Sequence, residues 1–240
     1  MERPARGYRI SPLLLGASAL FVACLVTSNI IAAKTARIGP LTAPAAIVLF
    51  PLAYLFGDVL TEVWGYATAR MVIWTGFLAN IVAVGFVAIA IVLPSDPSFH
   101  GQSAYAAILG QSPRLVGASL AAYLCGEFLN SFVLAKLKLF TRGRFLWTRT
   151  IGSTVVGQGV DSAIFISAGF LGVLPGSVVL TSIGSVWLLK VAYEVVATPL
   201  TYLIVTVVKR VEGVDAYDRH TSFAPIRLAA LRGLLREPAA

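Results

Sequence analysis

Three apolar stretches of this chain each carry two polar side chains that lie one helical turn apart. Residues three or four positions apart share a helix face, so the members of each pair would point in one direction. Carboxylates accept hydrogen bonds, whereas lysine and amide nitrogens donate them, and together these groups suit a polar ligand. The pairs are Glu127 with Asn130, Gln158 with Asp161, and Lys190 with Glu194.

A fourth pair lies in the stretch YLFGDVLTEVWGYATAR, where Asp58 and Glu62 are four residues apart. It is nearer to one end of its apolar stretch, and Arg70 follows it. We expect Asp58 and Glu62 to form a cytoplasmic-side gate or structural ion pairs with Arg70 or other inner-loop arginines. Substrate binding would be only their secondary role. Asn29, near the end of the first apolar stretch, is a further candidate for ligand binding.

The composition of the 240-residue chain indicates that these polar residues lie where little water is present to solvate them. Hydrophobic residues make up 58% of the sequence and charged residues only 12%, whereas about 25% charged residues is usual in a soluble domain. The net charge of +8 comes from short basic clusters between apolar runs. This pattern indicates membrane topology rather than a phosphate-binding face, so we expect a lipid bilayer and no nucleic acid as partner.

The chain is predicted to be an all-α integral membrane protein with six transmembrane helices and both termini in the cytoplasm. A crossing helix needs about 20 mostly apolar residues. The positive-inside rule places the basic N-terminus, the basic loop after the fourth span and the basic tail inside. We expect a cytoplasmic segment at 1–11, a six-helix domain at 12–208 and a cytoplasmic tail at 209–240. The predicted spans are Pro12–Ala33, Ala43–Val63, Met71–Leu93, Leu115–Leu137, Ile151–Leu171 and Thr181–Val208.

Charged residues at the centre of a bilayer cost from about 2.5 to more than 10 kcal/mol each. Glu127, Asp161 and Glu194 are predicted at a similar depth in three different helices, and one lysine cannot neutralise three acids. The surplus carboxylates must be protonated, hydrated or in contact with a ligand. We therefore expect a polar cavity near the midplane. For any single acid, a buried ion pair with Lys190 stays open as the structural alternative.

Enzyme motifs are absent from the sequence. It contains no HExxH, no GxSxG, no Walker A loop and no Rossmann fingerprint. Cys24 and Cys125 have no metal-ligand spacing, and His100 and His220 lie in predicted loops far apart. We expect no enzymatic activity, no cofactor and no metal site.

Several segments together resemble the queuosine precursor transporter family, also called the vitamin uptake transporter family. The resemblance covers roughly Ser28 to Pro225, and the ordered combination of segments is specific although each alone is weak. The segments are SNIIAAK, FPLAYLFGDVLTEVWGYATAR, LWTRTIGSTVVGQGVDSAIF, LKVAYEVVATPLTY and the tail VDAYDRHTSFAP.

The resemblance implies a six-helix importer in the cell inner membrane. Its substrates would be 7-deazaguanine precursors of queuosine, such as the cyano and aminomethyl forms, with queuine as a further candidate. We expect a secondary transporter. The alternatives are a substrate-capture subunit of an energy-coupling vitamin transporter and, with less support, a membrane-bound enzyme. Whether the protein forms a homodimer stays open.

Overall fold

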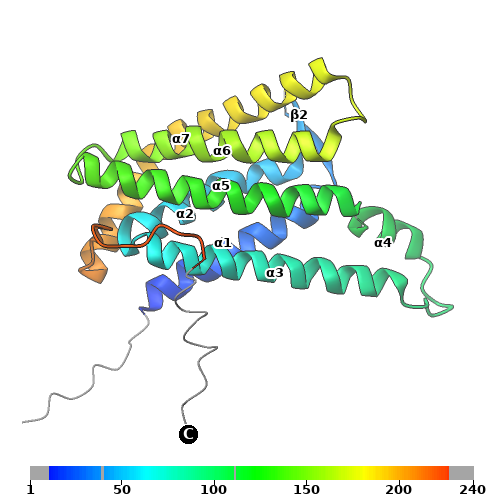
Figure 1. Cartoon of the computed structure of the whole chain (residues 1–240). Helices are drawn as coiled ribbons and strands as arrows, with labels where there is room; N and C mark the ends of the chain where they lie inside the picture. Colours follow the sequence, from blue (N-terminus) through cyan, green and yellow to red (C-terminus); the bar gives the residue numbers. More distant parts are fainter. Residues whose placement is uncertain (1–10, 39–40, 111, 227–240) are drawn as a thin grey trace, which may run out of the picture.

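The computed structural model describes residues 11–38, 41–110 and 112–226 and is almost wholly helical (Figure 1). The predicted all-α class is confirmed. Six main helices follow one another in the described residues, with a short helix, α4, between the third and the fourth. The helices are α1 Pro12–Ile31, α2 Phe50–Trp64, α3 Tyr66–Val92, α4 Gln102–Leu109, α5 Pro113–Phe140, α6 Leu146–Phe170 and α7 Gly176–Glu212.

The chain ahead of α2 departs from the prediction. The prediction that a helix begins at Ala43 was wrong, because residues up to Pro44 form a two-stranded antiparallel hairpin, β1 Thr35–Ile38 with β2 Leu41–Pro44. A 3-10 helix, η1 Ala45–Val48, follows, and α2 begins only at Phe50. The short helix α4 also lies in a segment that was predicted to be an outer loop.

Four stretches of the described residues are long and apolar enough to cross a bilayer by themselves. α2 falls short because it has only 15 residues, against about 20 for a crossing helix. α6 has 25 residues, but Gln158, Asp161 and small polar residues interrupt its apolar run. The four stretches are Pro12–Ile31, Tyr66–Val92, Gln102–Phe140 and Gly176–Glu212.

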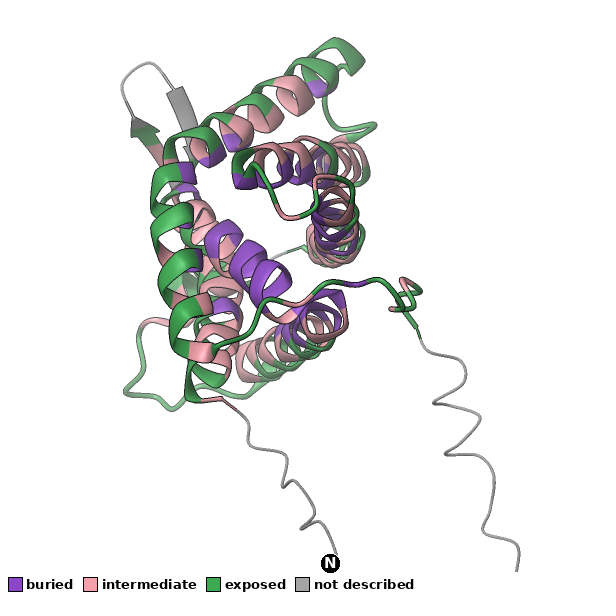
Figure 2. Cartoon of the chain, turned by 90° about the vertical axis from the view of Figure 1, so that its left-hand side faces the viewer, coloured by how far each residue is buried: buried purple, intermediate pink, exposed green. Residues whose placement is uncertain are grey.

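Large apolar side chains cover the outside of the helix bundle. Figure 2 shows the buried residues gathered toward the middle of the bundle and the exposed ones on its outer faces. An exposed apolar surface of this extent is typical of a protein that contacts lipid. On α3 the exposed residues include Leu78, Val82, Phe86, Ile89 and Val92.

Helices α5, α6 and α7 lie side by side in Figure 1, and α2 packs against both α7 and α5. Helix α7 has 37 residues and contains Pro199. Proline lacks the N–H that would bond the carbonyl one turn earlier, so the backbone ladder of α7 is interrupted there. Glu194 lies five residues before Pro199, on the N-terminal side of this interruption, as does Lys190.

The junction between α2 and α3 requires glycine. Gly65 has φ of +84°, a left-handed backbone that other residues rarely adopt. A Cβ at this position would lie 3.2 Å from the Cβ of Ala216 and 3.2 Å from Oδ1 of Asp218. The residues that follow α7 therefore pack directly on this junction.

Candidate functional site

Close packing of α5 against α6 brings their polar residues together. A Cβ at Gly126 would lie only 2.7 Å from the Cβ of Asp161, and a Cβ at Gly157 only 2.7 Å from the Cβ of Asn130. Contacts this short leave no room for a larger residue, so both positions need glycine. The glycine-rich segment of α6 stays helical throughout, and it serves helix packing rather than local unwinding.

Lys190 of α7 is the central donor of the interior. Its buried Nζ donates to Oε1 of Gln158 at 3.0 Å and forms an ion pair with Asp161, both on α6. Two of the three N–H groups of the ammonium are thus engaged. The contact pairs Lys190 with Asp161 rather than with Glu194, although Glu194 is one turn away on the same helix.

Glu127 of α5 lies next to this group. Gln158 is within hydrogen-bonding reach of the Glu127 carboxylate, and Asp161 and Lys190 are its charged neighbours. On its other side, a Cβ at Gly57 of α2 would lie 3.4 Å from Oε2 of Glu127. We call Glu127, Gln158, Asp161 and Lys190 the interior cluster.

Asp58 of α2 contacts an amide instead of an arginine. Nδ2 of Asn130 donates to Oδ1 of Asp58 at 3.0 Å, and both side chains are buried. No ion pair among the described residues includes Asp58 or Glu194. The expected pairing of Asp58 with inner-loop arginines is therefore not seen. The reason is depth, because Asp58 lies one turn farther from the basic helix ends than Glu62.

Five buried polar atoms around these residues have no hydrogen-bond partner among the residues that the structure describes. A buried polar atom without a partner costs about 1–3 kcal/mol, so such atoms are uncommon in native proteins. They come from α2, α5, α6 and α7. The atoms are the Tyr54 hydroxyl, Oδ2 of Asp58, Oδ1 of Asn130, the Ser162 hydroxyl and Oε1 of Glu194.

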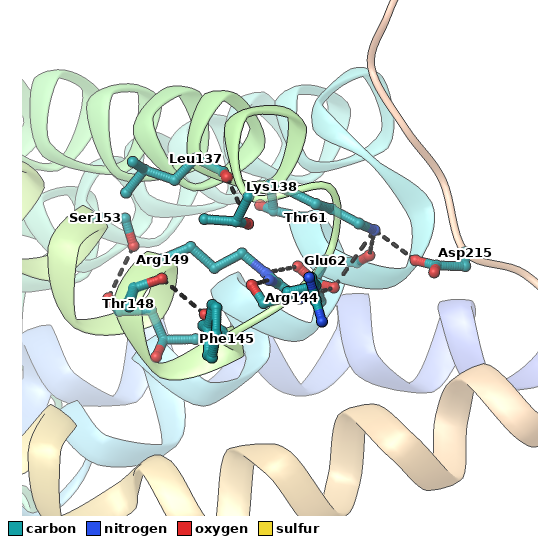
Figure 3. A network of polar contacts seen from close by, with 12 residues as sticks. Thr61, Glu62, Leu137, Lys138, Arg144, Phe145, Thr148, Arg149, Ser153 and Asp215 are labelled. Atoms are coloured by element: carbon teal, nitrogen blue, oxygen red, sulfur yellow. Dashed lines mark hydrogen bonds and ion pairs between the residues drawn. The ribbon is translucent and has the colours of Figure 1, made fainter.

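Glu62 is held by three cations at one end of the bundle, and Figure 3 shows Arg149 and Lys138 pointing toward it. Nε and Nη2 of Arg149 donate to the two Glu62 oxygens at 2.7 and 2.9 Å. Lys209 donates to Oε1 at 2.5 Å, and Lys138 lies 3.4 Å from the same oxygen. We call these four residues and Asp215 the Glu62 network.

Asp215, just beyond the end of α7, completes the Glu62 network. It forms ion pairs with Lys138 at 2.6 Å and with Lys209 at 2.8 Å. Partial burial acts to raise the pKa of Asp215, but hydrogen bonds from the two lysines outweigh burial and lower this pKa below its ordinary value. Lys138 also donates to the Ala216 carbonyl at 2.7 Å, so the network fastens the chain that follows α7.

Arg70 contacts the tail. It donates to the carbonyls of Ser222 and Ala224, each at 3.0 Å. A further hydrogen bond joins the tail to the start of α3, where the Tyr66 N–H donates to Oδ2 of Asp218 at 2.9 Å. Residues 213–226 are therefore a docked part of the fold, although they were predicted only as part of a basic cytoplasmic tail.

Asn29 lies in a different polar group from the interior cluster. Its Nδ2 donates to Oδ1 of Asn80 at 2.5 Å, and the Ser119 hydroxyl donates to its Oδ1 at 3.5 Å. Asn29 and Asn80 line a mainly apolar cavity whose other walls come from α1, α3, α4 and the start of α5. Asn29 therefore lines a cavity whose lining includes none of the residues of the interior cluster.

Some residues of the site were missed in the sequence. Tyr54 lies one turn before Asp58 on α2, and Ser162 lies one turn after Gln158 on α6, so helical spacing from the predicted residues was the available signal. Lys138 and Arg149 belong to the basic segment around the α5–α6 turn. Inner-loop arginines were expected as partners of Asp58 and Glu62, and Arg149 does pair with Glu62.

Comparison with known proteins gives a consistent result. A family model described as "Putative vitamin uptake transporter" matches residues 44–204, which contain the whole interior cluster. The "Probable queuosine precursor transporter" of Bacillus subtilis (strain 168) is 33% identical over 179 residues, which cover 74% of this chain and 78% of that protein. No solved structure gives a significant match. A chain with apolar membrane-crossing helices and this extent of family match belongs to the vitamin uptake transporter family.

Proposed function

We propose that this protein is a secondary transporter that imports queuosine precursors across the cell inner membrane. The substrates would be 7-deazaguanines such as the cyano and aminomethyl forms. The observation that carries the proposal is the interior cluster, in which charged and amide side chains of α5, α6 and α7 meet inside a membrane protein. The name of the Bacillus subtilis relative supports the substrate class.

The chemistry of the interior cluster suits a deazaguanine. The ring N1–H and the exocyclic amine are adjacent donors, and one carboxylate accepts both. We assign this role to Glu127 or Asp161. Lys190 has one N–H left after its contacts with Gln158 and Asp161, and it can donate to the ring carbonyl. For the aminomethyl substrate, Glu194 supplies a second acid for the added cation.

The Glu62 network supports the proposed six-crossing topology with both termini in the cytoplasm. Glu62 is near the end of α2, Lys138 near the end of α5, Arg149 near the start of α6 and Lys209 near the end of α7. These contacts gather four helix ends on one side of the bundle. The same side carries the basic residues, which supports its assignment to the cytoplasm.

The direct test is a binding titration of the purified protein with 7-cyano-7-deazaguanine. Glu127→Gln and Asp161→Asn keep side-chain shape and remove the charge and one acceptor. We expect at least one of them to lose affinity about tenfold, since about 1.4 kcal/mol corresponds to one decade. Asp96→Asn, on an exposed loop, is the matched control and should bind as the parent does. Parent-like binding by both cluster variants would contradict the assigned site.

Import requires a second assay that also separates a self-sufficient transporter from a capture subunit. The gene is expressed alone in a strain that lacks both queuosine precursor synthesis and its own importer. Queuosine in tRNA should reappear on addition of the precursor without any further subunit. Binding in vitro with no import in this strain would favour a substrate-capture subunit.

A further inference from the structure

The acid pair Asp58 and Glu194 lies beside the interior cluster but carries no ion pair among the described residues. Asp58 is 1% exposed and Glu194 is 2% exposed. Each has one oxygen without a hydrogen-bond partner, Oδ2 in Asp58 and Oε1 in Glu194. Nearly all buried polar atoms in native proteins have a partner, so these two oxygens are free to accept or to carry a proton.

The two acids lie on helices that pack together. Asp58 is on α2 and Glu194 on α7, and these helices are in direct contact. The charged side chains around Asp58 are Glu194, Glu127 and Glu62, and all three are acids. The neutral Asn130 donates the single side-chain hydrogen bond that Asp58 accepts from the described residues.

The cations near these acids are already engaged elsewhere. Lys190 is bound to Asp161 of α6, and Arg149 with the two lysines of the Glu62 network is bound to Glu62. From α5 the facing titratable group is Glu127, which is another acid. From α2 the facing groups are Glu62 for Asp58 and the Tyr54 hydroxyl for Glu194. No described neighbour therefore neutralises Asp58 or Glu194.

One proton matches this arrangement better than a metal ion does. Two carboxylates that are buried on packed helices without a cation do not both ionise, and they titrate as a coupled pair. A bound proton turns one acceptor into an O–H donor, which gives an unpartnered oxygen its partner. A hard cation would need about six oxygen ligands, and the described residues contain no group of three or more metal-ligating side chains.

We propose that Asp58 and Glu194 form the proton-binding site that couples precursor import to proton entry, a role that rests on the proposed transport function. The proton adds to one carboxylate on the outer-facing side of the cycle and leaves to water on the cytoplasmic side, with no other bond made or broken. Glu194 is one turn from Lys190, and Asn130 links Asp58 to the helix of Glu127. Proton loss restores repulsion between α2 and α7, and Pro199 weakens the α7 backbone close to that point.

The test uses purified full-length protein in liposomes with radiolabelled 7-cyano-7-deazaguanine. When the outside is one pH unit more acidic than the inside, the parent should concentrate the substrate inside about tenfold, as one coupled proton requires. Asp58→Asn and Glu194→Gln should lose this accumulation. In Asp58→Asn, substrate exchange at equal pH on both sides should also become independent of pH. The control Asp96→Asn should behave as the parent in both assays.

The outcomes separate this proposal from the transport function. Accumulation by both pair variants at the parent level would overturn the proton site, while parent exchange would still support transport. A parent that accumulates substrate with a sodium gradient and ignores the pH gradient would overturn it without any variant. A parent that neither binds nor exchanges the substrate would refute the proposed function itself, and the proton site with it.

Discussion

Replacement of Glu62 by Gln tests the contribution of the Glu62 network to stability. The Glu62 carboxylate is fully buried and is shared by Arg149, Lys138 and Lys209. Gln keeps the size of the side chain but removes the negative charge. Three cations would then be left at the ends of α5, α6 and α7 with only Asp215 to oppose them.

The expected loss follows from burial. Removal of one partner from a buried ion pair typically costs about 3–5 kcal/mol, because the other charge stays buried and uncompensated. Arg149 is 2% exposed, so the loss of its ion pair should carry the full cost in stability. Lys209 is 22% exposed, so the loss of its ion pair should cost less. Asp215 still offsets part of the lysine charge. We therefore expect Glu62→Gln to lower the free energy of unfolding by about 3 kcal/mol, the lower end of that range.

The assay is reversible unfolding in mixed detergent micelles, followed by tryptophan fluorescence. The matched control is Asp215→Asn in the same network, which should cost about 0–1 kcal/mol because its carboxylate is 44% exposed. In a double-mutant cycle, Glu62→Gln and Arg149→Gln together should lose less than the sum of the single losses. A Glu62→Gln loss no larger than that of Asp215→Asn would refute the argument from burial.

Three further predictions concern topology, helix packing and pH. Reporter fusions placed after Ser95 and after Gly176 should both report an outside location, and an inside signal at either would contradict six crossings. Gly157→Ala should lower stability by about 1–3 kcal/mol by overpacking, whereas Gly117→Ala on α5, with nothing within 4 Å of its Cβ, should show no loss in thermal unfolding. Because the folded-state pKa of Asp215 is lowered, its stabilising contribution is present above its unfolded pKa of about 3.9 and is lost as pH falls through the folded value. Thermal unfolding across acidic pH should show that loss in the parent, and Asp215→Asn should lack this component.

Much of the helical framework could be predicted from the sequence, because apolar runs of the required length leave few alternatives in a bilayer. Proline marks the first turn of α1 and α5, where its missing N–H costs nothing. The prediction failed where the local signal was ambiguous. The apolar run that begins at Ala43 continues into α2 without a charge, and the helix start after Pro44 looked as plausible as the one at Phe50, so the hairpin and η1 were not visible.

The candidate site was predictable as a list of residues but not as a set of contacts. Acids and amides at one-turn spacing identified Glu127, Asn130, Gln158 and Asp161, since any polar group at membrane depth needs a reason to be there. The sequence could not show that Asn29 lies elsewhere, with Asn80, because depth along a helix says nothing about which helix is adjacent.

Composition, hydropathy and the ordered segments by themselves determined the membrane class, the helical fold and the family. Only the tertiary structure decided the partners of the charges. It placed Arg149 on Glu62 across 87 positions of the chain and paired Lys190 with Asp161 instead of with its helical neighbour Glu194. Ion pairing depends on distances of a few ångströms between side chains of different helices, and these distances are set by how the helices pack in the folded chain. For this reason the acids left without a cation, Asp58 and Glu194, became visible only in the folded chain.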